Sequence, residues 1–194
     1  MSDIIHGKVP GWLSLFPVFL ILIHFSMAEQ AATLPINQDG KVEYYDSIVS
    51  GIDDHHLLWN NAIVFLNRLG VPDQLTAEAE VNVDTNELKQ QFGFYLYYKP
   101  ALTQQVDGVI LAEITLKIEK GKYTYRINNF RFIKYARDRY GRFTAESTKK
   151  YPLELYYPDS KRKTWQTHFA EIDSKITDLE QKMRADLMDF REID

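Results

Sequence analysis

The sequence predicts an α+β domain in which one antiparallel sheet carries two helices on one face. Three observations lead to this prediction. Apolar and polar residues alternate in several segments, as they do in half-buried strands. Two further segments, one early and one near the end, carry apolar residues at helical spacing. The resulting order, β-α-β-β-β-β-α, suits a two-layer architecture of helices against a sheet.

The N-terminus is predicted to lie outside this domain. Residues 12–28, WLSLFPVFLILIHFSMA, form an apolar run without a charged side chain. Small residues at Ser26 and Ala28 occupy the positions that a signal peptidase reads, so residues 1–28 are predicted to be a signal peptide cleaved near Ala28. An uncleaved membrane anchor is the alternative, because the segment before the run is only weakly basic. Residues 29–40 are polar and are interpreted as a tether.

The domain is predicted to open at Lys41 with a strand and a helix. Residues 41–50, KVEYYDSIVS, alternate on their even positions, which is typical of a strand. Ser50 and Asp53 have the spacing of a capping box, so a helix is predicted to follow them. This helix is expected to end near Leu69, just before a glycine. Its apolar face carries Leu58, Ala62, Phe65, Leu66 and Leu69.

Two more strands are predicted after the helix. Residues 75–83, LTAEAEVNV, alternate with period two. Residues 91–100, QFGFYLYYKP, form the next strand and place Phe92, Phe94, Leu96 and Tyr98 on one face. The other face also carries tyrosines, so both faces of this strand are expected to be partly covered.

The segment from Val109 to Tyr135 predicts a long β-hairpin. Lys120-Gly121 suits a two-residue turn, because glycine readily supplies a positive φ. With this turn every pair on one face is apolar, whereas a slip of one residue would bury Arg126. The hairpin register is therefore strongly specified. The apolar pairs are Ile118 with Tyr123, Leu116 with Tyr125, and Ile114 with Ile127.

The second arm of the hairpin changes parity at Asn128-Asn129. Beyond this point the apolar residues are Phe130 and Phe132, so a β-bulge is predicted to keep both rings inside the domain. Arg126 and Arg131 are then expected to point outward.

The C-terminal part is predicted to be an irregular segment followed by a long helix. Residues 136–160 contain Gly141 and two prolines, which interrupt regular structure. The closing segment, TWQTHFAEIDSKITDLEQKMRADLMDF, has an apolar stripe that suits packing on the sheet, and a coiled-coil seam between chains is the alternative. His168 lies off this stripe and is expected to be solvated. The stripe comprises Trp165, Phe169, Ile172, Ile176, Leu179 and Met183.

Three stretches of the chain carry a family resemblance. They are the hairpin ITLKIEKGKYTYRINNF, the early helix HHLLWNNAIVFL, and the closing helix entered through YPLELYYP. Together they resemble a family of exported bacterial domains of unknown function with a TATA-binding-protein-like (TBP-like) fold. The resemblance covers residues 41–190, which are interpreted as one domain. It implies a fold and an export route and brings no catalytic residues, and a fold does not fix a function.

The composition and the motifs argue against several function classes. The chain has no cysteine, which excludes disulfides and a lipid-modified N-terminal cysteine. Its sequence contains no Walker, G-x-S-x-G or G-x-G-x-x-G motif, so we expect no enzymatic activity and no cofactor. The DDHH stretch at residues 53–56 gathers metal-type side chains, but no second cluster in the sequence completes a four-ligand site. We therefore expect neither catalytic nor metal-binding residues.

A basic stretch offers the first candidate site. Residues 122–142 contain seven Lys or Arg and one Asp, in a chain of formal net charge −4. Nucleic-acid binding is not expected, because the register assigns half of the aromatic residues inward and an exported protein meets little nucleic acid. The first function hypothesis is a non-catalytic envelope interaction module that binds an anionic protein, glycan or lipid head group. Its candidate surface comprises Arg126, Arg131, Arg137, Arg139 and Arg142.

Two alternatives accompany this hypothesis. The arginines would instead be structural if they pair with Glu146, Glu154 and the acidic closing helix. The second function hypothesis is a small-ligand carrier with a cavity between helices and sheet. Either protein would act in the periplasm or cell envelope, and it would contact the membrane only through an uncleaved signal. The candidate cavity residues are Tyr44, Phe94, Tyr98, Tyr125, Phe132 and Trp165.

Overall fold

The structure is a computed structural model that describes residues 33–72, 80–98, 105–159 and 162–188. The predicted signal peptide, residues 1–28, lies outside the described residues. The elements are β1 (Tyr44–Val49), α1 (His55–Asn67), β2 (Glu80–Asn82), β3 (Glu87–Tyr98), β4 (Gln105–Glu119), β5 (Lys122–Arg137), β6 (Phe143–Ala145), β7 (Tyr151–Pro152), a 3-10 helix η1 (Leu153–Asp159) and α2 (Lys163–Leu187).

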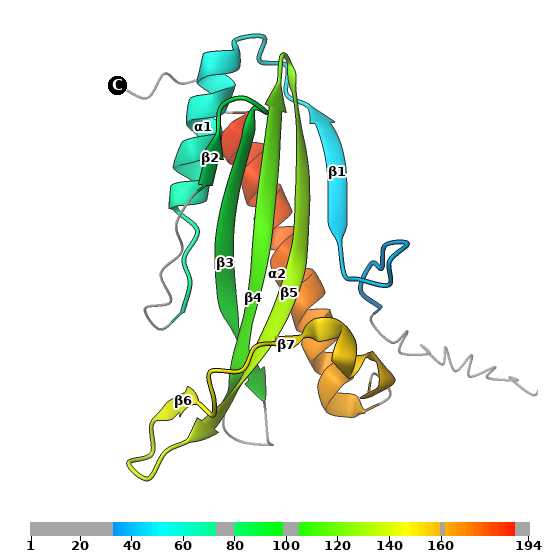
Figure 1. Cartoon of the computed structure of the whole chain (residues 1–194), viewed down its shortest axis with the longest axis vertical. Coiled ribbons are helices and arrows are strands. Elements are labelled where there is room, and N and C mark those ends of the chain that lie inside the picture. The colour runs from blue at the N-terminus through cyan, green and yellow to red at the C-terminus, as the bar shows by residue number, and fades with distance from the viewer. Residues whose placement is uncertain (1–32, 73–79, 99–104, 160–161, 189–194) are drawn as a thin grey trace, which may run out of the picture. The chain divides into compact units, whose positions relative to one another are not determined.

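The strands form one antiparallel sheet, as the sequence predicted. Its order is β1-β5-β4-β3-β2, and the short strands β7 and β6 pair with the far end of β5. Both long helices contribute to a single hydrophobic core on one face of this sheet, and in Figure 1 the strands lie in front of α2. The opposite side of the sheet, hereafter the open face, is the side that faces the viewer in Figure 1.

The predicted hairpin register is confirmed. Ile118 pairs with Tyr123, Leu116 with Tyr125 and Ile114 with Ile127, and all six side chains are buried. Gly121 supplies the positive φ of the turn, at 72°. The ion pair between Lys122 and Glu119 spans this turn at 2.6 Å.

The predicted bulge is also confirmed. Glu113 pairs with Asn128 while Leu111 pairs with Arg131, so β5 accommodates one residue more than β4 between these pairs. Asn129 adopts a positive φ of 54°, a conformation that asparagine tolerates better than most residues. The extra residue keeps Phe130 on the core side, where its ring is 1% exposed.

The start of α1 corrects the sequence prediction. Asp54, and not Ser50, caps the helix: its Oδ1 accepts hydrogen bonds from the backbone N–H groups of His56 and Leu57 at 2.8 and 3.3 Å. The Ser50 hydroxyl instead accepts from the N–H of Ile52. The physical reason is a turn at Gly51, whose φ of 72° redirects the chain before the helix can begin.

The folded domain begins earlier than Lys41. Residues 33–40 belong to the predicted tether, but Leu34 is 3% exposed and joins the core. Ile36 forms a β-bridge with Val42, and the turn between them is closed by the backbone hydrogen bond from Gly40 to Asn37. This part of the N-terminal segment is therefore packed on the domain.

The closing helix packs on the sheet within its own chain, as predicted. Trp165, Phe169, Ile172, Ile176 and Met183 are all buried, and Leu179 packs against the same core. The helix is also held by polar contacts at its margin. Arg184 pairs with Asp46 at 2.8 Å, and the hydroxyls of Tyr125 and Tyr44 donate to Glu180 and Asp173 at 2.7 and 2.9 Å, respectively.

Two tyrosines beneath α2 predict a loss of stability in alkali. Burial raises the pKa of Tyr123 from 10.0 to about 12. Burial, followed by the hydrogen bond to Glu180, also raises the pKa of Tyr125. Because the folded pKa values exceed the unfolded ones, their stabilising contribution is complete below pH 10 and is lost as the pH rises toward 12. Urea unfolding at pH 8 to 11.5 should show this decline.

The Tyr123→Phe variant is the matched comparison. The Tyr123 hydroxyl is buried and has no hydrogen-bond partner among the described residues. Its removal should leave stability at pH 7 unchanged or slightly higher, and it should weaken the alkaline decline. An identical decline in the variant would exclude Tyr123 as a contributor.

Candidate functional site

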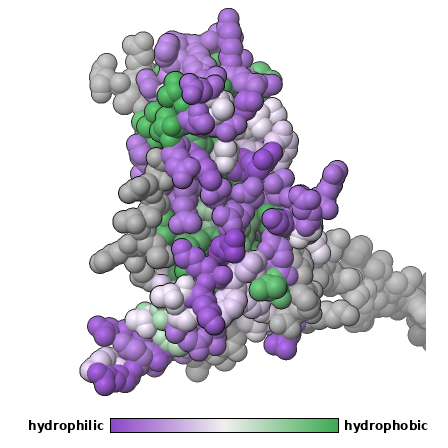
Figure 2. All heavy atoms as spheres, in the orientation of Figure 1, coloured by the Kyte–Doolittle hydropathy of each residue, from purple (hydrophilic) through white to green (hydrophobic). Residues whose placement is uncertain are grey.

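The open face of the sheet divides into a polar half and an apolar half. From the β4–β5 turn to the middle of the sheet it carries ion pairs, such as Lys117 with Glu119 at 3.9 Å and Lys89 with Glu113 at 3.1 Å. Toward the other end, a second apolar cluster is centred on Val109, Leu111, Ile133 and Tyr135, all 6% exposed or less. Figure 2, viewed from this side, shows a mostly hydrophilic surface interrupted by hydrophobic patches. The apolar half is the part where a partner or ligand would find buried contacts.

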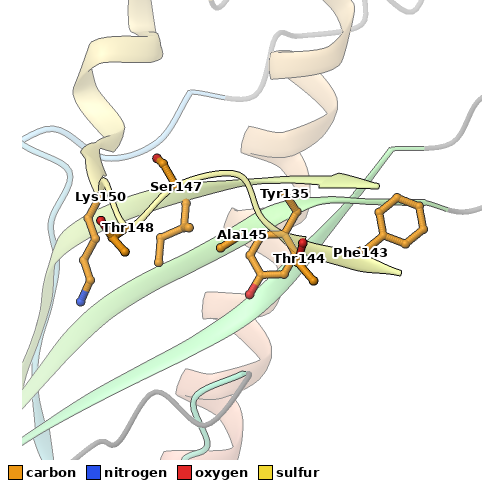
Figure 3. Close-up of a pocket in the computed structure, with 8 residues that line it drawn as sticks. Tyr135, Phe143, Thr144, Ala145, Ser147, Thr148 and Lys150 are labelled. Atoms are coloured by element: carbon orange, nitrogen blue, oxygen red, sulfur yellow. The ribbon is translucent and has the colours of Figure 1, made fainter. Parts of the chain in front are cut away.

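A pocket of about 510 Å³ opens at this apolar half. Its floor is formed by Ile133 and Tyr135 of β5, and its wall is formed by β6 and the segment that follows it (Figure 3). This segment is fastened to β5 at its start, where Glu146 accepts a salt bridge from Lys134 at 3.0 Å, and at its end, where β7 pairs with β5. The backbone N–H of Glu146 also donates to the carbonyl of Lys134 at 2.9 Å. The residues of the wall are Phe143, Thr144, Ala145, Ser147, Thr148 and Lys150.

The basic hairpin of residues 137–143 connects β5 to β6 beside this pocket. Asp138 organises its turn: Oδ1 accepts from the backbone N–H groups of Tyr140 and Arg142, each at 2.8 Å. Its Oδ2 accepts from Nε of Arg142 at 3.1 Å. The hydrogen bond from the Arg142 backbone is the largest cause that lowers the pKa of Asp138 below its ordinary value of 3.8. The carboxylate is thus charged, and the turn is held, at neutral pH.

The three hairpin arginines differ in their roles. Arg137 donates from Nε to the carbonyl of Gly141 at 3.0 Å, and Arg142 binds Asp138, so both help to hold the hairpin. The guanidinium of Arg139 stacks over the ring of Tyr140 at 4.7 Å and makes no ion pair with a described residue. Tyr140 is itself 67% exposed. The guanidinium of Arg142 also lies over this ring, at 5.4 Å. Arg139 is therefore available to a partner without loss of an ion pair, and Tyr140 is largely exposed beside it.

The other two candidate arginines lie on β5, away from the hairpin. Both point outward as predicted. Arg126 lies 3.7 Å from Glu43 and stacks over Tyr45, whereas Arg131 donates to the side chain of Asn129 at 3.0 Å. Arg126 is separated from Arg137 by roughly 35 Å of strand, at about 3.3 Å per residue. The predicted five-arginine surface is thus a compact group of three in the basic hairpin plus two separate residues.

The proposed structural pairing of these arginines is not the one observed. Glu146 pairs with Lys134, and Glu154 accepts a hydrogen bond from the backbone N–H of Val42 at 3.0 Å. The partners of the arginines are local groups. Arg137 and Arg142 bind groups of their own turn, Arg126 lies near Glu43, and Arg131 binds the side chain of Asn129.

Five of the six predicted cavity residues have described side chains, and these five belong to or pack against the core on the helix side of the sheet. Trp165 stacks on Tyr156 with ring centroids 4.1 Å apart, and the edge of Phe132 meets both rings at 5.3 Å. Tyr44 packs against Phe130 at 5.9 Å. Of the five whose side chains are described, Tyr125 lines a polar depression beside the β4–β5 turn, and none lines the pocket between β5 and β6. Phe94 is partly buried beneath Lys175, and the side chain of Tyr98 lies outside the described part.

The prediction that His168 is solvated is wrong. His168 is 1% exposed, and its Nε2 lies 2.8 Å from Oδ2 of Asp107 at the start of β4. The edge of its ring packs against Trp165, which is three residues earlier on α2. That spacing placed His168 at the margin of the apolar stripe. Asp107 could not be identified as its partner from local pattern, because the pair is separated by 61 residues.

The described residues add two further findings about possible functions. They contain no group of three or more His, Asp or Glu side chains placed to hold a metal ion, so residues 53–56 do not assemble a site with other described ligands. Within the same residues, no helix has both the length and the apolar character needed to cross a membrane.

Comparisons with known proteins support the fold. No protein-family model and no curated protein matches this chain. It is similar to the crystal structure of a DUF4468 family protein from Bacteroides ovatus, with 16% identity, a TM-score of 0.53, and coverage of 77% of this chain and 90% of that one. It is also similar to a TBP-like protein from Parabacteroides distasonis, with 12% identity, the same TM-score, and coverage of 77% and 96%. These similarities confirm the TBP-like fold expected from the sequence. Neither protein is named for an enzymatic activity.

Proposed function

We propose that this chain is an exported, non-catalytic interaction module of the cell envelope that binds an acidic protein through its basic hairpin. The observation that supports the proposal is the projection of this hairpin, at β6, beyond the rest of the sheet (Figure 1). A narrow projection can enter a depression on a partner that a flat sheet cannot reach. Its turn carries Arg139 and Tyr140, the residue types that most often dominate binding energy in protein interfaces.

Electrostatics favours an acidic partner. The hairpin carries three arginines and one aspartate, whereas the whole chain has a net charge of −4. Oppositely charged surfaces accelerate encounter and orient it, so the basic hairpin would meet an acidic protein first. A guanidinium group also matches a carboxylate through two parallel hydrogen bonds, which an exposed Arg139 is free to make.

The decisive variant is Arg139→Ser combined with Tyr140→Ser. The turn is held by hydrogen bonds of Asp138 and Arg137, whereas Tyr140 contributes a ring contact with Arg142 at 5.4 Å. Folding should therefore be preserved while the partner contact is lost. Retention of residues 29–194 on immobilised envelope material should fall about tenfold or more, as for interface residues that dominate binding. Retention of the parent should also fall when salt is raised to 0.15 M, where charges are screened over about 8 Å.

The control variant is Arg126→Ser, which removes the same charge from a different part of the open face. It should be retained like the parent. Protease treatment of the envelope material before the assay should abolish retention of the parent. Retention that survives protease would indicate a glycan or lipid partner and would overturn the acidic-protein assignment. Unchanged retention of the double variant would overturn the role of the basic hairpin.

Export has a separate test, which depends on the N-terminal sequence alone. The mature protein is expected to begin at Glu29, because Ser26 and Ala28 mark the cleavage site. Intact-mass analysis of the protein from the envelope fraction checks this. A mass that includes residues 1–28 would indicate a retained membrane anchor, and a protein confined to the cytoplasm would contradict export.

A further inference from the structure

We propose that the pocket on the open face binds a small amphipathic carboxylate, which is an apolar body with one anionic head. This inference goes beyond the proposed function, because it involves neither the turn of the basic hairpin nor a protein partner. The pocket of about 510 Å³ lies within the range of roughly 300–1,000 Å³ that is usual for small-molecule sites.

The floor and part of the wall provide an apolar, preformed surface. Ile133 and Tyr135 are 5% and 6% exposed, so backing residues fix their positions. Behind them lie Val109 and Leu111, both fully buried. Phe143 packs against this cluster from β6 and lines the pocket together with Ala145. An apolar ligand body would therefore bury its surface without requiring the floor to rearrange.

The remaining wall is polar, and the described residues that line it include one free cation. Thr144, Ser147 and Thr148 supply hydroxyls, and Lys150 supplies an ammonium group. The neighbouring Lys134 is already paired with Glu146 at 3.0 Å. This hydrogen bond raises the pKa of Lys134, and the charge of the lysine is balanced by that of the carboxylate. Lys150 has no ion pair or hydrogen bond with a described residue. An unpaired ammonium beside an apolar surface favours a ligand that brings its own negative charge.

The arrangement also orients the ligand. Figure 3 shows Lys150 and Phe143 at opposite ends of the group of lining residues, with Tyr135 and Ala145 between them. A carboxylate bound to Lys150 would direct its apolar body over Tyr135 toward Phe143. The proposed class is thus a single-headed carboxylate with a chain or ring system.

The test uses a pair of ligands that differ only in charge. The fluorescent probe 11-(dansylamino)undecanoic acid has an apolar body and a carboxylate, and its methyl ester lacks the charge. The parent protein, residues 29–194, should bind the acid about tenfold more tightly than the ester, the value expected for one charged hydrogen bond. Binding is measured by the increase in dansyl fluorescence during titration.

Three variants locate the effect. Lys150→Met should abolish the preference for the acid while retaining binding of the ester. Lys149→Met, the matched control, removes the same charge from a neighbour that does not line the pocket, and the preference should persist. Ala145→Trp should fill the pocket and abolish binding of both ligands. If this variant fails to fold, Thr148→Phe fills the pocket from the exposed segment.

Specific results would overturn the inference. They are failure of the parent to bind either probe, equal binding of acid and ester, or a preference for the acid that survives Lys150→Met. Binding that survives both pocket-filling variants would place the probe elsewhere. The Arg139→Ser, Tyr140→Ser variant should bind both probes like the parent. Failure of the protein-partner proposal would therefore leave this result unaffected.

Discussion

Replacing Ile172 with alanine is expected to lower the free energy of unfolding by about 2–5 kcal/mol, as in other buried large-to-small substitutions. Ile172 is fully buried near the middle of α2 and belongs to the core cluster between both helices and the sheet. The cavity would lie between elements that are fixed on several sides, so the surroundings can relax only partly. Urea denaturation monitored by circular dichroism measures the change.

Thr177→Ala is the matched control on the same helix. Thr177 is exposed, so its truncation should change stability by no more than about 0.5 kcal/mol. The experiment also separates the two interpretations of the apolar stripe of α2. An Ile172→Ala variant that unfolds like the parent while a dimer dissociates would identify the stripe as a seam between chains.

The long hairpin was predictable because several independent signals agree along it. Alternation shows that the strand face with Ile114, Leu116 and Ile118 is buried, and Gly121 determines the position of the turn. Since side chains repeat every two residues, a single slip would reverse every assignment on both strands. At Asn129 the apolar residues change from odd to even positions, and a bulge at this point buries both of the phenylalanines that follow.

Features that depend on one residue or on distant partners were not predictable. Ser50 and Asp54 are both good helix caps, and only the turn at Gly51 decides between them. Strands β6 and β7 have three and two residues, too few to show alternation, so the prediction that residues 136–160 are irregular missed both strands. The buried pair of His168 and Asp107 depends on the placement of α2 against β4, which local pattern does not encode.

The candidate sites also combine features that local pattern predicts with features that only the fold determines. Charge and register predicted outward arginines, but the fold of residues 137–143 decides that three of them gather in one hairpin. The pocket beside them depends on β6 returning along β5, where Tyr135 pairs with Ala145, and β6 has only three residues from which the sequence could indicate this return. The cavity predicted between helices and sheet is a different place from this pocket. Large aromatic rings pack together on the helix side of the sheet.

Gly108→Ala is expected to destabilise the domain by about 1–3 kcal/mol, the usual cost of overpacking a filled interior. A Cβ atom at Gly108 would lie 2.3 Å from Cε2 of Phe132 and 2.5 Å from the carbonyl oxygen of Ile133. The carbonyl belongs to β5, so it cannot retreat without disturbing the pairing with β4. Movement of the Phe132 ring would disturb Trp165, which it contacts at 5.3 Å.

Gly70→Ala is the control that isolates this steric cause. No atom lies within 4 Å of the corresponding Cβ position at Gly70, so this variant should unfold like the parent. Phe132→Leu, with a smaller side chain, should partly relieve the clash. The double variant with Gly108→Ala should therefore lose less stability than the two single changes together. Strict additivity would show that the phenylalanine ring is not the obstacle, and it would assign the cost to the β5 backbone.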